Sequence, residues 1–165
     1  MSTQLYLIRH AIAAEQQEYA SDQERPLSAE GETKARQVAR RLRRLKLSFD
    51  LVLTSPLVRA RQTAEIFQSE GLSSHLREST FLEPQGSFDQ WLTWLEQWRP
   101  AEPVSLALVG HQPDLGQWSE TLLWGEAKQV FILKKAGIIG LSLPTIGPIV
   151  GNSRLFWLTP PRFLI

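Results

Sequence analysis

Four residues of this sequence are of types that can attack, bind and stabilise a phosphoryl group. They are Arg9, His10, Arg59 and His111. Each stands at or shortly after the end of a segment predicted to be a β-strand, and the carboxyl ends of parallel strands meet at one edge of a sheet. We therefore expect the four side chains to converge on one site. That convergence carries more weight than any one of the residues alone.

Two imidazoles and two guanidinium groups around one pocket suit phosphoryl transfer. The lone pair of a neutral imidazole can attack phosphorus and form a phosphohistidine, which water then cleaves. Nearby guanidinium groups lower the pKa of the imidazole and balance the charge on the oxygens of the transferring group. This chemistry requires no metal, and the sequence lacks the HxH or HxxxH pair that would indicate a zinc site. His75, in a polar stretch, has no such context and is interpreted as incidental.

Arg59 supports the hypothesis independently of the histidines. It is predicted to lie about one turn into a helix that begins at Ser55 and Pro56. The positive end of a helix disfavours a cation by a few tenths to about 1 kcal/mol. A bound anion reverses that sign, because helix N–H groups and the guanidinium then converge on the same charge. The alternative is a surface arginine that extends into water.

Strands and helices alternate through most of the chain. Short apolar runs predict strands at 4–8, 51–54, 104–109, 130–133, 136–143 and 154–158. Caps and helical periodicity predict helices after the N-cap Ser28, from the N-cap Ser55 to Gly71, over 88–98 and over about 113–123. This alternation predicts a three-layer α/β/α sandwich on a mostly parallel sheet.

Three segments leave alternatives open. The polar residues 11–26 lack periodicity and predict a long loop, and loops of that length are more often functional than idle. The aromatic stripe of the helix at 88–98 indicates a core-facing surface more strongly than a ligand shelf. The basic run at 40–46 could be a nucleic-acid patch, but a solvated helix end is the stronger interpretation.

Composition places limits on the class of protein. The chain has 165 residues, which suits a single domain over 1–165, and a net charge of +1, which favours neither nucleic acid nor an anionic membrane. It has no cysteine, so disulfides and thiolate catalysis are excluded. No run approaches the roughly 20 apolar residues that span a bilayer, and the N-terminal segment does not resemble a signal peptide. We expect a cytoplasmic protein.

Four sequence blocks resemble the histidine phosphatase superfamily, also called phosphoglycerate-mutase-like. The blocks are LIRHAIA (7–13), RPLSAEG (25–31), LTSPLVRARQTAE (53–65) and ALVGHQPDL (107–115). The resemblance implies that His10 is the phosphorylated nucleophile and that Arg9 and Arg59 bind phosphate. It implies that His111 stabilises the transferring group, and it implies the superfamily fold. The chain is too short for the large cap domain of mutases, and we expect no cofactor.

The short length and the RPLS block look most like the SixA-type phosphohistidine phosphatases, which act on signalling proteins. Two departures stand out: Ala11 replaces the usual glycine after the Arg-His pair, and the general-acid carboxylate of ester-cleaving members has no clear place. Glu83 is the nearest candidate for that acid. An alkoxide leaving group needs a proton, whereas imidazole leaving a P–N bond needs less help. These features favour a phosphohistidine protein as partner over a small phosphate ester.

Three rival interpretations remain. The first is a mutase or small-molecule ester phosphatase of the same superfamily, which would need a placed acid and a lid. The second is a non-catalytic phosphoprotein-binding module, against which the presence of His10 and His111 argues. The third is a receiver or flavodoxin-like domain, which requires an acidic cluster or a flavin-phosphate loop at the position where this chain has Arg9 and His10.

Overall fold

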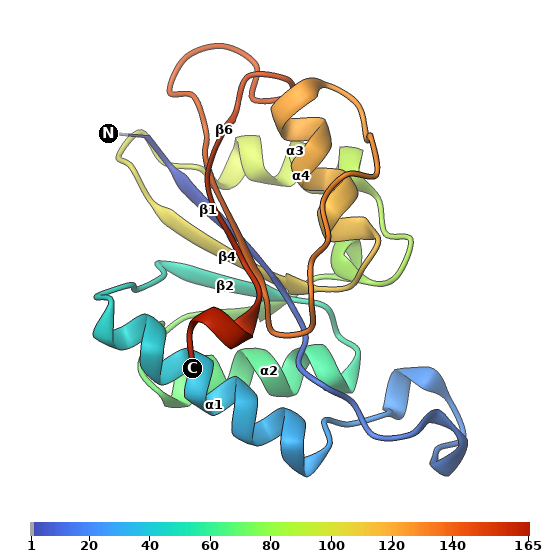
Figure 1. Cartoon of the computed structure of the whole chain (residues 1–165). Coiled ribbons are helices and arrows are strands. Elements are labelled where there is room, and N and C mark those ends of the chain that lie inside the picture. Colours follow the sequence, from blue (N-terminus) through green and yellow to red (C-terminus); the bar gives the residue numbers. More distant parts are fainter. Residues whose placement is uncertain (1) are drawn as a thin grey trace.

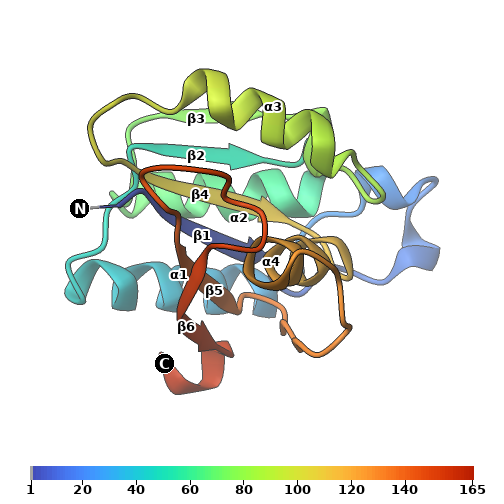
Figure 2. The same ribbon diagram turned by 90° about the horizontal axis from the view of Figure 1, so that it is seen from above.

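A six-stranded sheet forms the middle layer of the protein in a computed structural model that describes residues 2–165 (Figures 1 and 2). The strands are β1 (Gln4–Arg9), β2 (Leu51–Thr54), β3 (Leu76–Glu78), β4 (Ser105–Gly110), β5 (Ile138–Ser142) and β6 (Arg154–Thr159). Their order across the sheet is β3-β2-β4-β1-β5-β6. The neighbours from β3 to β1 pair in parallel, and β5 runs antiparallel to both β1 and β6. The predicted mostly parallel sheet is therefore confirmed.

Helices cover both faces of this sheet. They are α1 (Ala29–Arg44), α2 (Val58–Ser69), α3 (Phe88–Trp98) and α4 (Asp114–Trp124). The first two lie on one face and the last two on the other, as Figure 1 shows. The three-layer α/β/α sandwich is confirmed, and residues 2–165 add no large cap domain to it. Organisation as one domain remains a prediction, consistent with a sheet to which all six named strands belong.

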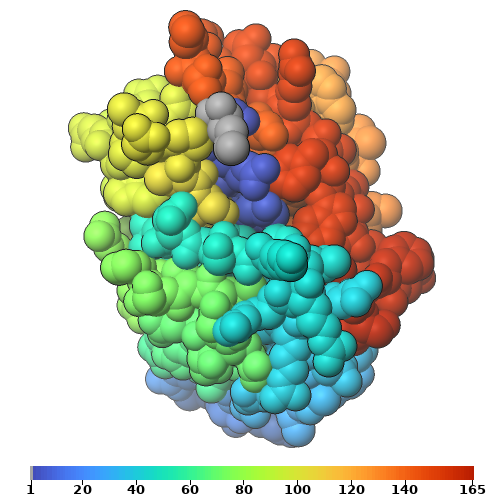
Figure 3. All heavy atoms as spheres, turned by 90° about the vertical axis from the view of Figure 1, so that its left-hand side faces the viewer, coloured from blue at the N-terminus to red at the C-terminus, as the bar shows by residue number. Residues whose placement is uncertain are grey.

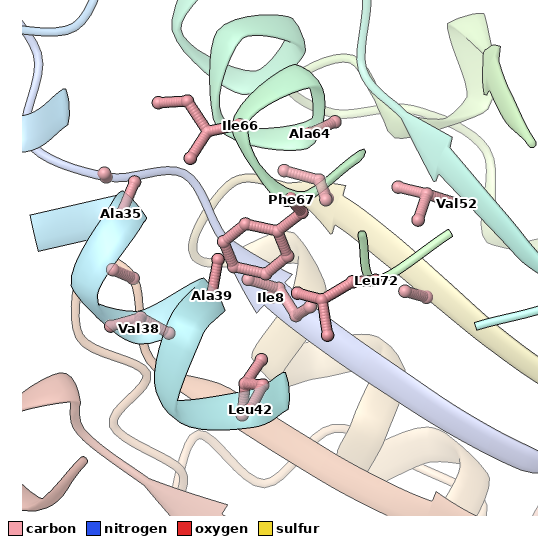
Figure 4. Close-up of a cluster of buried hydrophobic side chains, with 14 of the residues drawn as sticks. Ile8, Ala35, Val38, Ala39, Leu42, Val52, Ala64, Ile66, Phe67 and Leu72 are labelled. Atoms are coloured by element: carbon pink, nitrogen blue, oxygen red, sulfur yellow. The ribbon is translucent and has the colours of Figure 1, made fainter. Parts of the chain in front are cut away.

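The core is divided into two layers by the sheet, because successive side chains of a strand point to opposite faces. In β1, Tyr6 and Ile8 join the cluster beneath α1 and α2, whereas Leu5 and Leu7 join the cluster beneath α3 and α4. Figure 4 shows the first cluster, with Phe67 of α2 among the apolar side chains of α1 and the sheet. Burial of each large apolar side chain is worth roughly 1.5–3 kcal/mol, so both layers hold the strands in register.

The aromatic stripe of α3 faces the core. Trp91 and Leu95 are buried, and Phe88, Leu92 and Trp98 pack against the same cluster while remaining partly exposed. The core-facing interpretation of residues 88–98 is therefore confirmed.

The strand predicted at 130–133 is wrong. These residues form an irregular segment between α4 and β5. The buried Glu120 carboxylate of α4 accepts hydrogen bonds from the backbone N–H groups of Lys128, Gln129, Val130 and Phe131. Because these donors are bound by one side chain, the β-prone sequence of the segment does not pair with a strand.

The start of α2 also differs from the prediction. Leu57, rather than Ser55, is the N-cap, and the helix begins at Val58, so Arg59 is its second residue instead of lying a full turn inside. The Ser55 hydroxyl has other partners, since it accepts from Leu57 N and contacts His111. At the other end, Gly71 follows the C-cap with φ of 85°, as expected for a helix stop.

Strand β3 was not predicted, because its three residues are intermediate or exposed and give no apolar run. The other strand and helix predictions agree with the structure to within two residues at their ends, and those at 51–54 and 88–98 match it at both ends. At the end of α1, the basic residues Arg40, Arg41, Arg43 and Arg44 are exposed, and Arg36 and Arg40 pair with Glu70. This arrangement agrees with a solvated helix end.

The long loop predicted at 11–26 is present within the connection between β1 and α1, drawn in blue at the lower right of Figure 1. Its base is closed by a bridge between Ala13 and Leu27 and by a 2.9 Å hydrogen bond from Ser28 N to Ile12 O. Gly31 lies against this base so closely that a Cβ atom there would stand 2.0 Å from the Ile12 carbonyl oxygen. Two short 3-10 helices, Gln16–Glu18 and Asp22–Glu24, lie in the loop.

The edge at which the parallel strands begin lies opposite this loop. Figure 3 shows that edge, with the start of β1 in dark blue between the segment before β4 and the segment that joins β5 to β6. Among residues 2–165, no helix is long and apolar enough to cross a membrane.

Candidate active site

The carboxyl ends of three neighbouring strands bring the site together. Arg9 is the last residue of β1 and pairs with Gly110, the last residue of β4, so His10 and His111 follow side by side. The His10 and His111 ring centroids lie 5.2 Å apart. Ser55 follows the end of β2, the strand next to β4, and Ser55 N donates to Val109 O at 2.9 Å. The predicted convergence of the histidines thus follows from the register of the sheet.

His10 is held in one tautomer. Its Nδ1 lies 2.7 Å from the carbonyl oxygen of Ala11, and because a carbonyl can only accept, Nδ1 carries the hydrogen. The lone pair is therefore on Nε2, which lies 3.3 Å from Arg59 Nε. The pKa of His10 is lowered to about 3, mainly by burial. The hydrogen bond to Ala11 O raises this pKa, whereas positive charge on His111, Arg59 and Arg9 lowers it further. The imidazole is thus neutral at pH 7, as a nucleophile must be.

His111 is likewise buried and neutral. Its Nε2 lies 2.8 Å from Ser55 Oγ. The pKa of His111 is lowered to about 4, mainly by burial and next by the positive charge of Arg59. The negative charge of Asp22 raises this pKa, and the positive charge of Arg9 lowers it further. The influence of Asp22 places a carboxylate near this second histidine.

Arg9 and Arg59 approach the two histidines from different elements. Arg9 Nη1 donates to the carbonyl oxygen of Leu133, at 3.1 Å, in the segment before β5. Arg59 enters from the second position of α2 and is 5% exposed. Burial lowers the pKa of both guanidinium groups. All four residues predicted from the sequence are therefore near neighbours, although their catalytic roles remain a proposal.

Two buried nitrogen atoms of this cluster lack a partner. Arg9 Nε and His111 Nδ1 are inaccessible to solvent and have no hydrogen-bond partner among residues 2–165. Buried polar atoms are almost always paired in native structures. A tetrahedral oxyanion next to His10 Nε2 would supply acceptors at this cluster.

The sequence interpretation missed the two charged residues that the long loop brings to the site. Asp22 Oδ2 lies 3.0 Å from Arg59 Nη2, Asp22 O lies 2.8 Å from Arg59 Nη1, and Asp22 Oδ1 lies 2.9 Å from Arg25 Nη2. Burial tends to raise the pKa of Asp22, but Arg59 and then Arg25 outweigh it and hold that pKa below its ordinary value. Arg25 belongs to the RPLS block, and that block could have indicated it as a site residue. No feature of the sequence indicates Asp22.

Positive charge surrounds the cluster. Burial lowers the pKa of Lys135, and so does the charge of Arg9, Arg25 and Arg59, against a raising effect of Glu15. Such an environment suits a dianionic phosphoryl group. Among residues 2–165, no three His, Asp or Glu side chains are grouped so as to hold a metal ion.

Glu83, the candidate general acid, lies just beyond the 3-10 helix Thr80–Leu82 and is partly exposed. Among the described residues its side chain makes no hydrogen bond or ion pair. Its neighbour in the same turn, Gln85, donates from its backbone N to Asp114 Oδ2 at 2.7 Å. Burial raises the pKa of Asp114, which lies three residues after His111.

Comparison with known proteins gives a consistent result. A family model described as the histidine phosphatase superfamily (branch 1) matches residues 5–106, a range that holds Arg9, His10 and Arg59 and ends before His111. The chain is 48% identical over 164 residues to an uncharacterized protein of Picosynechococcus sp., covering 98% of this chain and 99% of that protein. It is 30% identical over 159 residues to the phosphohistidine phosphatase SixA of Escherichia coli, covering 96% and 94%.

A solved structure agrees with these relatives. The protein histidine phosphatase SixA complexed with tungstate superposes with a TM-score of 0.85 at 28% identity, over 99% of this chain and 100% of that chain. The resemblance suggested by four sequence blocks therefore extends over nearly the whole fold.

Proposed function

The chain is a phosphatase of the histidine phosphatase superfamily (branch 1), and we propose that His10 takes the phosphoryl group from a phosphohistidine of a signalling protein. Arg9, Arg59 and His111 bind the oxygens of that group. No cofactor or metal takes part, and the expected setting is the cytoplasm. The observation that carries the proposal is the lone pair of His10 Nε2, which accepts from Arg59 Nε, in a cluster that also holds two buried, unpaired nitrogen atoms, Arg9 Nε and His111 Nδ1.

The first step transfers the phosphoryl group. His10 Nε2 attacks phosphorus with its lone pair, the P–N bond of the substrate breaks, and the departing imidazole keeps the bonding electron pair and takes a proton from water. Positive charge from Arg9 and Arg59 stabilises the equatorial oxygens as they pass through the transition state. The hydrogen on His10 Nδ1 stays bound to Ala11 O, so the ring keeps its orientation.

The second step regenerates the enzyme. Water attacks the phosphorus of phosphorylated His10, the P–Nε2 bond breaks, and inorganic phosphate leaves with the oxygen from water. Asp22 remains ionised, since Arg59 and Arg25 hold its pKa low, and it can accept a proton from the attacking water.

The carboxylates around the site support phosphohistidine as the substrate. An ester needs an acid to protonate its alkoxide, and an Asp22 that stays ionised cannot act as that acid. Glu83 has no contact that would direct it toward the histidines. The relative SixA of Escherichia coli is a phosphohistidine phosphatase, which supports the same substrate, as does the lack of a large cap in the described chain.

One observation favours a small phosphate ester instead. Burial raises the pKa of Asp114, which lies three residues after His111 in sequence, and a general acid requires a carboxyl with a raised pKa. The alternative is thus an ester phosphatase or mutase in which Asp114 or Glu83 protonates the leaving group. The other alternative, a non-catalytic phosphoprotein-binding module, lacks an observation in its favour.

The deciding experiment compares a phosphohistidine-bearing protein with a small alkyl phosphate. We expect the higher kcat/KM for the phosphohistidine protein, and little effect of Glu83→Gln or Asp114→Asn on it. A higher kcat/KM for the alkyl phosphate, destroyed by either substitution, would establish the ester phosphatase. Binding of phosphoproteins without turnover of any phosphate would establish the binding module.

A further inference from the structure

A buried hydroxyl group contacts the second histidine. Ser55 Oγ lies 2.8 Å from His111 Nε2, and Ser55 and His111 are 0% and 4% exposed. The backbone fixes this pair, because Ser55 N donates to the carbonyl oxygen of Val109, two residues before His111 in sequence. The contact therefore joins two adjacent strand ends and is not an incidental meeting of mobile side chains.

The hydrogen bonds of Ser55 favour donation from its hydroxyl group to His111. Its Oγ already accepts from Leu57 N, at 3.2 Å. A serine hydroxyl has one hydrogen and two lone pairs, so it could in principle also accept from Nε2. The buried hydroxyl hydrogen would then have no acceptor among residues 2–165, whereas donation to His111 Nε2 pairs it. When Ser55 donates to Nε2, a neutral His111 must carry its own hydrogen on Nδ1.

The Nδ1 atom of His111 is the one that lacks a partner. It is buried and makes no hydrogen bond to any residue from 2 to 165, and its ring lies next to that of His10. With hydrogen on Nδ1, the ring offers a donor there to an anionic oxygen. With hydrogen on Nε2, it would offer a lone pair, which repels that oxygen.

We propose that Ser55 is a positioning residue that donates to His111 Nε2 and so keeps the hydrogen of His111 on Nδ1, as a donor to the transferring phosphoryl group. The inference rests on the proposed function, which gives His111 its role. It adds that the tautomer of His111 is set by a hydroxyl on the neighbouring strand end. This is the logic by which a third group orients a catalytic imidazole.

The tautomer can be observed without a substrate. In the ¹⁵N NMR spectrum of the free wild-type protein, we expect His111 Nδ1 to carry the hydrogen and Nε2 to be a hydrogen-bond acceptor. In Ser55→Ala we expect the hydrogen of His111 to shift toward Nε2. A wild-type protein with the hydrogen on Nε2 would overturn the inference, and this measurement needs no variant to fold.

Kinetics supply the second readout. Ser55→Ala should lower kcat about a hundredfold with little change in KM, because removing one aligned donor to the transition state costs on the order of 10²–10³ in kcat. Ser55→Thr, which keeps a hydroxyl, should retain most of the activity. Ser119→Ala is the matched control, since it also removes a buried hydroxyl, one that donates to Leu115 O within α4.

The outcomes separate this inference from the proposed function. If the wild type turns over phosphohistidine and folded Ser55→Ala does so equally fast, the inference is wrong and the proposed function stands. If the wild type turns over no phosphate at all, the proposed function fails, and the NMR result still decides the tautomer of His111.

Discussion

Asp22 and Arg59 are joined by an ion pair and by a backbone hydrogen bond, so the long loop is bound to the arginine that the proposed function assigns to phosphate. The carboxylate oxygen Oδ2 lies 3.0 Å from Nη2, and the carbonyl oxygen lies 2.8 Å from Nη1. The third guanidinium nitrogen of Arg59, Nε, donates to His10 Nε2 at 3.3 Å. A phosphoryl group that binds here must therefore compete with an anion of the protein itself.

We predict that Asp22→Asn binds oxyanions more tightly. The substitution removes the competing charge, and a partly exposed ion pair is worth up to about 1 kcal/mol, so the Kd for tungstate or phosphate should fall about two- to fivefold. Calorimetric titration at low salt measures this change. Glu24→Gln is the control, because Glu24 is exposed in the same 3-10 helix; an Asp22→Asn protein with unchanged or weaker binding would refute the competition.

An oxyanion soaked into crystals should occupy the space between the four predicted residues. Arg9, Arg59 and His111 offer donors beside His10 from two strand ends and one helix start, and two nitrogen atoms of this cluster are unpaired. Tungstate, sulfate or phosphate should therefore lie next to His10 Nε2. An anion bound only elsewhere in the crystal, with none among these four side chains, would refute the assignment of the site.

Substitution of the nucleophile should stop turnover. His10→Ala removes the attacking atom, and we expect no measurable turnover with a Tm close to that of the wild type. Arg59→Ala should reduce kcat by roughly 10²–10³, the range for loss of one aligned electrostatic donor. Steady-state rates with thermal melts as the folding control test both; a His10→Ala protein with substantial activity would exclude a phosphorylated His10.

Chelators should leave the rate unchanged. The attacking group is an imidazole and the oxygens are bound by guanidinium groups, so the proposed steps involve no metal ion. Turnover measured with and without EDTA tests this expectation. Loss of activity with EDTA and its recovery on addition of a divalent ion would require another mechanism.

The two site histidines should make the fold less stable in mild acid. Their pKa values are lowered to about 3 for His10 and about 4 for His111, whereas a histidine in an unfolded chain titrates near about 6.5. Below that value the unfolded chain binds protons that the folded chain does not, so the free energy of unfolding falls as pH falls. The slope approaches about 1.4 kcal/mol per pH unit for each histidine.

Urea unfolding at pH values between about 7 and 5 measures this slope. His10→Ala should reduce the slope of the unfolding free energy against pH by the contribution of one histidine. The control His75→Ala, at an exposed position, should leave the slope as in the wild type. A wild-type stability that is constant across the range would contradict burial of neutral histidines at the site.

The sheet and most helices could be predicted because burial leaves a pattern in the sequence. The run Leu106–Val109 is fully buried in the central strand, and the spacing of Val38, Ala39 and Leu42 matches the buried side of α1. The segment at 130–133 misled the prediction because its residues are as β-prone as a strand. Glu120, ten or so residues earlier, decides its conformation, and no local pattern reveals that contact.

The site was predictable to the extent that its residues follow strands. Arg9, His10 and His111 stand at strand ends, where a parallel sheet gathers functional side chains. Asp22 lies in a polar loop whose path depends on contacts with Arg59 and Arg25, so the sequence alone gave no reason to select it. Ser55 was interpreted as a helix cap because serine before proline is a common helix start, whereas its hydroxyl contacts His111.

The Glu120 carboxylate has a consequence for how this protein can diverge. It binds only main-chain N–H groups in the segment 128–131, so it is indifferent to which side chains that segment carries. Two residues further on, Leu133 O holds the Arg9 guanidinium. The exposed side chains at 128–130 can therefore be exchanged, and this surface remodelled toward new partners, while the backbone that supports Arg9 stays in place.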